Sequence, residues 1–133
     1  MTVRFADTHY FLALVDPAEE AHERANQFTR GLKGSIVTTQ WVLNELAGAL
    51  AEPPYRSEFV RLLGVLKSDP SVTIVPATAA LFDSGLALYA ERTDKAWSLV
   101  DCISFLVMKQ RRIREALTAD HHFEQAGFVA LLK

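Results

Sequence analysis

Residues 3–15 read VRFADTHYFLALV, and this stretch contains both kinds of element from which the fold is predicted. Residues 3–6 are mostly apolar and include a β-branched and an aromatic residue, which predicts a strand. Thr8 is a suitable N-cap for a helix over residues 9–15. The stretch therefore predicts a strand that leads into a helix, with Asp7 between them.

The same alternation continues along the chain. Further strands are predicted at residues 35–38, 72–75, 116–118 and 129–132. Helices are predicted at residues 16–30, 40–51, 55–68, 78–91 and 98–109. For residues 16–30, Asp16 is the expected N-cap, Pro17 the first helical residue and Gly31 the stop. Because the connections are long enough for crossovers, the pattern predicts a parallel sheet with helices on both faces.

Length and composition predict one domain over residues 1–133, because single cores usually hold about 100–150 residues. Cys102 is the one cysteine, which excludes an intrachain disulfide and is typical of a reducing compartment. Asp7 interrupts the N-terminal apolar run, so no signal peptide is predicted. No stretch approaches the roughly 20 apolar residues of a membrane span. We therefore expect a cytoplasmic protein that does not bind a membrane.

The net charge of −2 argues against a module that grips many phosphates of a duplex, since such modules are usually basic. Contact with nucleic acid would need a local patch, a metal that offsets the acids, or a partner chain. The one dense basic cluster is Lys109, Arg111, Arg112 and Arg114. It is interpreted as a helix C-terminus, where the helix dipole favours cations.

Two acids follow predicted strands. Asp7 comes directly after the first strand, and Asp120 follows the fourth after Thr118 and Ala119. Ligands of open parallel sheets bind beyond the carboxyl ends of the strands. Asp7 and Asp120 are therefore expected where such a fold places its chemistry.

Two further acids have structural alternatives. Glu45 lies on a largely apolar helix face, where a carboxylate is costly unless it is paired, bound to a metal, or able to reach water at the edge. Asp101 is three residues after Ser98, which is the spacing of a capping box. An acid held in this way can also serve as a ligand. Four acids gathered together would repel one another unless a cation were present, and oxygen ligands suit Mg²⁺ or Mn²⁺.

Several segments resemble the PIN-domain nucleases. The opening resemblance lies in residues 5–14, FADTHYFLAL, and in residues 39–45, TQWVLNE. Residues 97–105, WSLVDCISF, together with residues 117–128, LTADHHFEQAGF, closely resemble the C-terminal half of VapC-like members. The resemblance covers nearly the whole chain in the same order.

The resemblance implies a three-layer α/β/α sandwich with a central, mostly parallel five-stranded sheet. It implies a metal-dependent endoribonuclease, with Asp7, Glu45, Asp101 and Asp120 as the catalytic and metal-binding acids. Mg²⁺ or Mn²⁺ would be the cofactor and RNA the substrate. Many bacterial members are toxins of type II toxin–antitoxin pairs, so a small antitoxin protein and a homodimer are expected.

Hydroxyl residues at Thr8, Ser98 and Thr118 match positions near the family's site and are expected to orient carboxylates or a metal-bound water. Asp94 precedes the third acid, and a solvated loop position is favoured over a place at the entrance. His121 and His122 follow Asp120. Without a recognisable set of Cys and His ligands they predict no zinc site, and a surface position is favoured over a phosphate contact.

Three other functions are considered. A housekeeping RNA-processing nuclease would share the site but have no antitoxin. A phosphotransfer receiver domain would need an acid after the third strand, where the chain reads Pro76-Ala77-Thr78. A non-catalytic binding module on the same fold would bind a partner without cutting RNA.

Overall fold

The computed structural model describes residues 2–31 and 34–133, which form a parallel sheet covered by helices on both faces. The strands are β1 (Thr2–Ala6), β2 (Gly34–Thr39), β3 (Val72–Val75), β4 (Glu115–Leu117) and β5 (Val129–Ala130). Their order across the sheet is β3-β2-β1-β4-β5, and every pair is parallel. Receiver domains and flavodoxins use the order 2-1-3-4-5, so this order excludes the receiver alternative.

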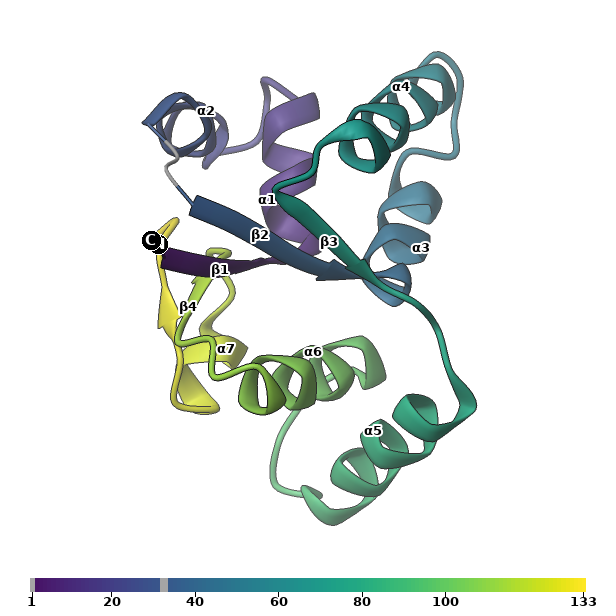
Figure 1. The fold of residues 1–133 in the computed structure, drawn as a ribbon, viewed down its shortest axis with the longest axis vertical. Helices are drawn as coiled ribbons and strands as arrows, with labels where there is room; N and C mark the ends of the chain where they lie inside the picture. The colour runs from purple at the N-terminus through teal and green to yellow at the C-terminus, as the bar shows by residue number, and fades with distance from the viewer. Residues whose placement is uncertain (1, 32–33) are drawn as a thin grey trace.

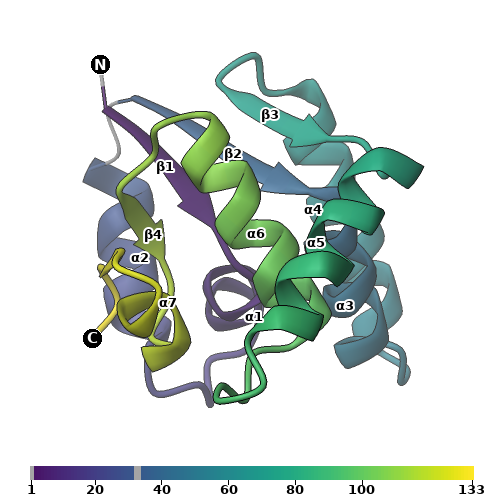
Figure 2. The ribbon, with the colours of Figure 1, turned by 90° about the horizontal axis from the view of Figure 1, so that it is seen from below.

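Within residues 2–31 and 34–133, seven helices form the outer layers. They are α1 (Thr8–Val15), α2 (His22–Gly31), α3 (Gln40–Ala49), α4 (Tyr55–Ser68), α5 (Ala79–Glu91), α6 (Leu99–Gln110) and α7 (His121–Gln125). Figure 1 shows α1 to α4 on one side of the sheet and α5 to α7 on the other. Figure 2 looks onto the second side, where α6 lies over the strands and α5 lies outside α6. The predicted three-layer fold with helices on both faces is confirmed.

Strand β1 lies at the centre of the sheet, and its apolar residues explain why. Phe5 and Ala6 are fully buried, and Phe5 pairs with Val37 of β2 on one side and Ala116 of β4 on the other. The ring of Phe5 also lies 6.3 Å from that of Phe123 on α7. Burial of such a strand on both faces is typical of a parallel sheet. The residue after it, Asp7, is therefore carried into the interior.

The layer beneath the sheet is built around aromatic side chains of α6 and α7. Phe105 packs edge-on against Trp97 and Phe123, with ring centroids 5.0 Å apart in both pairs. Cys102 is completely buried in the same layer, as its apolar surroundings in the sequence predict. Within residues 2–31 and 34–133, no helix has the length and apolar character needed to span a bilayer.

The element boundaries show where local patterns fail. The predicted helix over residues 16–30 begins only at His22, because Asp16 accepts a hydrogen bond from the backbone of Ala18 and the chain turns instead. Thr8 is the first residue of α1 and not its N-cap, a position that Asp7 occupies. Helix α7 is absent from the sequence prediction.

Other boundaries differ by one or two residues. Helix α3 ends at Ala49, β4 covers Glu115–Leu117, and β5 ends at Ala130. Helix α4 and strand β3 have the predicted bounds. The N-caps predicted at Thr39 and Ser98 are present, with their hydroxyls accepting from Val42 N and Asp101 N.

Candidate active site

The candidate site lies at the carboxyl ends of β1 and β4, which are neighbouring parallel strands. Asp7 follows β1 directly, and Asp120 is three residues beyond the end of β4. Asp101 lies in the first turn of α6, and Glu45 lies on α3, the helix that follows β2. The four acids therefore come from four different segments of the chain.

Asp7 is the most deeply buried of these acids, with 3% of its surface exposed. Its Oδ2 accepts a hydrogen bond of 2.9 Å from the Thr118 hydroxyl. Burial raises the pKa of Asp7 to about 6, and the nearby charge of Asp101 adds to this shift. The Thr118 hydrogen bond and the charge of His9 oppose the shift. A carboxylate in this position is costly without a cation.

Thr118 connects the two acids at the strand ends. While its hydroxyl donates to Asp7, the same oxygen accepts a 3.0 Å hydrogen bond from the backbone N–H of Asp120. Thr118 is completely buried, so this hydroxyl is held in one orientation. It therefore sets the position of the Asp7 carboxylate relative to the turn that carries Asp120.

Asp101 is held by a capping box at the beginning of α6. Its Oδ2 accepts from the backbone N–H of Ser98, and Ser98 Oγ accepts from the backbone N–H of Asp101. Asp101 is 8% exposed. It forms part of the cap of α6, and the same carboxylate could also serve as a metal ligand.

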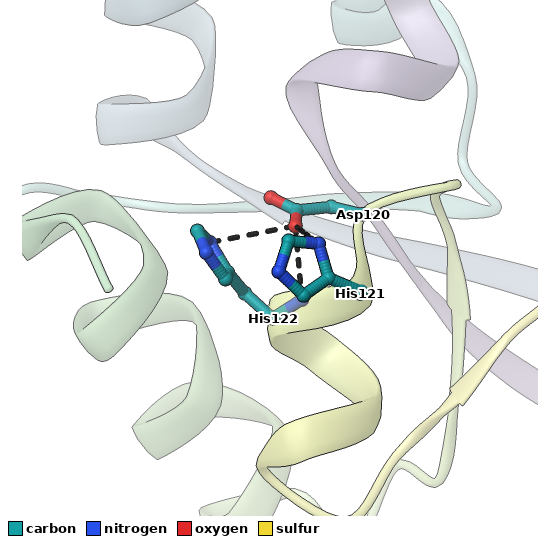
Figure 3. Close-up of side chains that lie close together, drawn as sticks. All are labelled: Asp120, His121 and His122. Carbon is teal, nitrogen blue, oxygen red and sulfur yellow. Dashed lines mark hydrogen bonds and ion pairs between the residues drawn. The ribbon is translucent and has the colours of Figure 1, made fainter. Parts of the chain in front are cut away.

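Asp120 is the N-cap of α7, and its Oδ1 accepts a 2.9 Å hydrogen bond from the backbone N–H of His122. The His122 ring turns back towards the acids, with Nδ1 3.1 Å from Asp101 Oδ2 and 3.4 Å from Asp120 Oδ1. Figure 3 shows both imidazoles beside the Asp120 carboxylate. His121 is exposed as expected, but the surface position expected for His122 is wrong, because this side chain is half-buried between two acids.

Glu45 lies at the outer edge of the site. It is exposed, and its Oε1 accepts from the hydroxyl of Thr8, the residue after Asp7. One alternative drawn from the sequence is that Glu45 reaches water at the edge of an apolar helix face, and its exposed position agrees with that alternative. The hydrogen bond from buried Thr8 also ties it to the strand end that carries Asp7. The hydroxyls of Thr8 and Thr118 each donate to one of the acids, whereas Ser98 holds the Asp101 carboxylate through its backbone N–H. The orienting role expected for the three hydroxyls stays a prediction.

Asp94 belongs to a different set of contacts. It forms a two-pronged pair with Arg92, at 3.0 and 3.1 Å, and lies 3.8 Å from Lys95 Nζ. The Arg92 hydrogen bond lowers the pKa of the Asp94 carboxyl. Its side chain is 60% exposed, which agrees with the solvated loop position favoured from the sequence.

The donor atoms at this edge suit a divalent cation. Ligand atoms of Asp7, His9 and Asp120 lie within 4.8 Å of one another, and Asp101 is linked to Asp120 through His122. A cation would offset the cost of burying Asp7, and oxygen donors of this kind suit hard ions such as Mg²⁺ and Mn²⁺. The residues present therefore fit such a metal.

Comparison with known families classifies this chain. A model of the PIN domain matches residues 4–129. This chain belongs to the PIN-domain family. The family resemblance drawn from the sequence is thereby confirmed.

The PIN domain described here has a relative of nearly equal length. It is 26% identical over 125 residues to the 23S rRNA-specific endonuclease VapC20 of Mycobacterium tuberculosis, across 94% of this chain and 95% of that protein. The crystal structure of VapC20, described as a Sarcin-Ricin loop cleaving toxin, matches with a TM-score of 0.86 at 24% identity. That match covers 96% of this chain and 97% of VapC20.

Two further solved structures share the fold at lower identity. FitAcB from Neisseria gonorrhoeae matches with a TM-score of 0.66 at 19% identity, over 97% of this chain and 96% of that one. VapBC2 from Rickettsia felis, bound to a DNA fragment from its promoter, matches with a TM-score of 0.66 at 11% identity and the same coverage. The fold of this PIN domain is therefore shared over almost its whole length.

Proposed function

We propose that this PIN domain is a metal-dependent endoribonuclease and the toxin of a type II toxin–antitoxin pair. The observation that carries the proposal is the buried carboxylate of Asp7, held by Thr118 beside Asp120 and within the field of Asp101. Such an arrangement is costly on its own and becomes useful when it holds a metal. The relative named as a 23S rRNA-specific endonuclease supports RNA as the substrate class.

In this proposal Asp7, Asp101 and Asp120 hold Mg²⁺ or Mn²⁺, and Glu45 contributes from the edge of the site. The ion would supply an activated water and stabilise negative charge on the scissile phosphate. The protein's part is positioning. Thr118 orients Asp7, and the capping box orients Asp101. Thr8 holds Glu45 in reach. The products would carry 5′-phosphate and 3′-hydroxyl ends, as the family resemblance implies.

RNA would approach along a hollow of about 890 Å³ between α5 and the loop before α6. Arg92, Lys95 and Ser98 are among the residues that line it, and Ser98 caps the helix whose first turn carries Asp101. Arg92 and Lys95 supply positive charge there that the overall charge of −2 does not, although Asp94, which is paired with both, offsets part of it. The exposed basic cluster begins in the last turn of α6, at the other end of that helix, which agrees with its interpretation as a helix C-terminus.

A small antitoxin partner and a homodimer remain part of the proposal. The relative VapC20 is described as a toxin, which supports the toxin role, and an antitoxin partner is what the family resemblance implies. Apolar side chains of Phe82, Leu86 and Tyr89 are exposed on α5, where a partner chain would cover them. A housekeeping RNA-processing nuclease would use the same site without an antitoxin, so inhibition by an antitoxin encoded beside this chain separates the two.

The test is cleavage of a panel of RNAs that includes ribosomal RNA, with DNA of matched sequence as the control. Cleavage of RNA in Mg²⁺ or Mn²⁺ that stops when EDTA is added would support the proposal. Equal cleavage with and without EDTA would contradict it. Intact partner binding without cleavage of any RNA would favour the non-catalytic module.

A further inference from the structure

Two adjacent histidines begin α7, and both lie beside the carboxylate of Asp120 (Figure 3). Asp120 Oδ1 is 3.7 Å from Nδ1 of His121 and 3.4 Å from Nδ1 of His122. One ligand atom from each of the three residues lies within 4.8 Å of those of the other two. The proposed cleavage chemistry uses the carboxylate and leaves both imidazoles without a role.

The spacing of these atoms suits a single metal ion. Two donors that are each about 2.1 Å from one ion at the tetrahedral angle lie about 3.4 Å apart. The distances of 3.7 and 3.4 Å from Asp120 Oδ1 to the two imidazole nitrogens are therefore close to the separation of two ligands of one ion. The side chain of His121 is 64% exposed and can rotate, whereas those of His122 and Asp120 are 20% and 17% exposed and form the more rigid side of the site.

Donors from other elements surround this group, so it does not depend on the end of one short helix. Asp101, on α6, places Oδ2 3.1 Å from Nδ1 of His122. Asp7 and His9, at the end of β1 and the beginning of α1, place ligand atoms within 4.8 Å of Asp120. Carboxylates from two other segments thus make the surroundings negative, which favours a cation.

The nitrogen donors decide the chemical class of that cation. Mg²⁺ takes oxygen ligands, whereas imidazole suits Zn²⁺ and its neighbours among the transition metals. The sequence alone predicts no zinc site, but the structure brings these donors together. We propose that Asp120, His121 and His122 form a nitrogen-and-oxygen site that binds a divalent transition ion of the Zn²⁺ class more tightly than Mg²⁺. Each imidazole would bind as the neutral tautomer through Nδ1, with its proton on Nε2, so His122 Nδ1 would exchange its contact with Asp101 Oδ2 for the ion.

Asp120 belongs both to this site and to the carboxylate set proposed for cleavage. A bound Zn²⁺ ion would therefore compete with the cleavage metal and lower the rate in Mg²⁺. This consequence rests on the proposed function. The binding of the ion does not depend on the proposed function, and it can be measured without any RNA.

The experiment is calorimetric titration of the full chain, freed of metal with EDTA and dialysed, with Zn²⁺ and separately with Mg²⁺. The test variants are His121→Gln and His122→Gln. His22→Gln is the matched control, because His22 lies on α2 and its Nδ1 contacts Ala13 O. We expect tighter binding of Zn²⁺ than Mg²⁺ in the unaltered chain. Each test variant should bind Zn²⁺ at least about tenfold more weakly, since even outer partners of metal ligands are worth that much.

A second readout identifies the atoms. In long-range ¹H–¹⁵N spectra, addition of Zn²⁺ should move the Nδ1 signals of His121 and His122, with smaller changes at Nε2. The His22 signals should stay in place. Circular dichroism in EDTA checks that each variant is folded. If His122→Gln does not fold, the exposed His121→Gln carries the test.

Equal affinity for Zn²⁺ and Mg²⁺ in the unaltered chain would overturn the proposal, as would equal Zn²⁺ affinity in the test variants and the control. Loss of Zn²⁺ binding in His9→Gln alone would also overturn it, because the ion would then belong to Asp7, His9 and Asp120. Cleavage in Mg²⁺ is assayed separately. Absent cleavage with retained Zn²⁺ binding would count against the proposed function and leave this site intact.

Discussion

Burial raises the pKa of Asp7 to about 6, so in the absence of metal this side chain holds its proton at a higher pH than a free aspartate. The protonated form favours the folded state. Its contribution to stability is fully present below the ordinary pKa of 3.8 and is lost as the pH rises through 6. Ionised Asp7 therefore destabilises the metal-free protein at neutral pH.

The first prediction compares the unaltered chain with Asp7→Asn in EDTA by urea denaturation. At pH 8 the variant should be the more stable protein, because it removes a buried charge. At pH 5 the difference in free energy of unfolding should shrink by about 1.4 kcal/mol, from linkage with a pKa near 6. An equal difference at both pH values would contradict the assigned cause.

The second prediction concerns Thr118→Val, which keeps the shape but removes the hydroxyl between Asp7 and Asp120. Loss of the donor should raise the pKa of Asp7 further, because that hydrogen bond lowers it. RNA cleavage should fall by about 10- to 100-fold near pH 7, as for other groups that orient metal ligands. The pH–rate profile should move to higher pH, and Thr118→Ser should restore it. An unchanged profile would exclude this positioning role.

Among single residues, contacts between neighbours in the sequence can be predicted, whereas contacts between residues far apart in the sequence cannot. The capping box of Ser98 and Asp101 follows from a spacing of three residues. The hydrogen bond between Thr118 and Asp7 joins residues 111 positions apart, and only the pairing of β1 with β4 brings them together. The inward turn of His122 also needs Asp101 from another element, so no local signal could have revealed it.

Among the elements, α6 has the closest link to the site, because its first turn holds Asp101. The third prediction is that Ser98→Ala lowers the free energy of unfolding by about 1 kcal/mol through loss of the cap. It should also weaken Mn²⁺ binding, because Asp101 loses its anchored geometry. Thr78→Ala is the control, since Thr78 caps α5 by accepting from Leu81 N. Thr78→Ala should lower the free energy of unfolding by a similar amount and leave Mn²⁺ binding unchanged. Equal losses of Mn²⁺ affinity in the two variants would contradict the role of Ser98 in holding Asp101.

Helix α5 packs closely on α6 at Gly85, where an added methyl group would overlap the side chain of Ile103. The fourth prediction is that Gly85→Ala destabilises the protein by about 1–3 kcal/mol, the usual cost of overpacking. Gly64→Ala on α4 is the matched control, because nothing lies within 4 Å of its added Cβ. That variant should gain about 0.5–1 kcal/mol from helix propensity. Thermal and urea unfolding measure both, and equal effects would refute the close packing.

Element prediction succeeds where prolines bound a regular apolar pattern, as for α4 after Pro53-Pro54 and for β3 between Pro70 and Pro76. It fails at residues 16–21, where Asp16 accepts from the backbone of Ala18 in a turn instead of capping a helix. Asp and Ser side chains can bond to nearby backbone groups either in a turn or as a helix cap, so the same residues are compatible with both structures. Helix α7 has five residues, which is too short for a helical period to appear.

For the whole molecule, alternation of strands and helices predicts a parallel sheet, but the strand order β3-β2-β1-β4-β5 depends on pairing between distant segments. That order places β1 beside β4 and so brings Asp7 next to Asp120. The acid site was predicted because both residues follow strands. Its hydroxyl links and imidazoles appear only once the order is known.

The central claim is that the acids at this sheet edge cut RNA with a bound metal. Its most direct test is the RNA cleavage rate in Mn²⁺ of the unaltered chain, Asp7→Asn and Asp69→Asn, the last removing an exposed carboxylate that contacts Ser71 before β3. We predict a loss of at least about 100-fold in Asp7→Asn, as for removal of an essential catalytic group. Asp69→Asn should keep the unaltered rate. Equal rates in all three proteins would contradict the account.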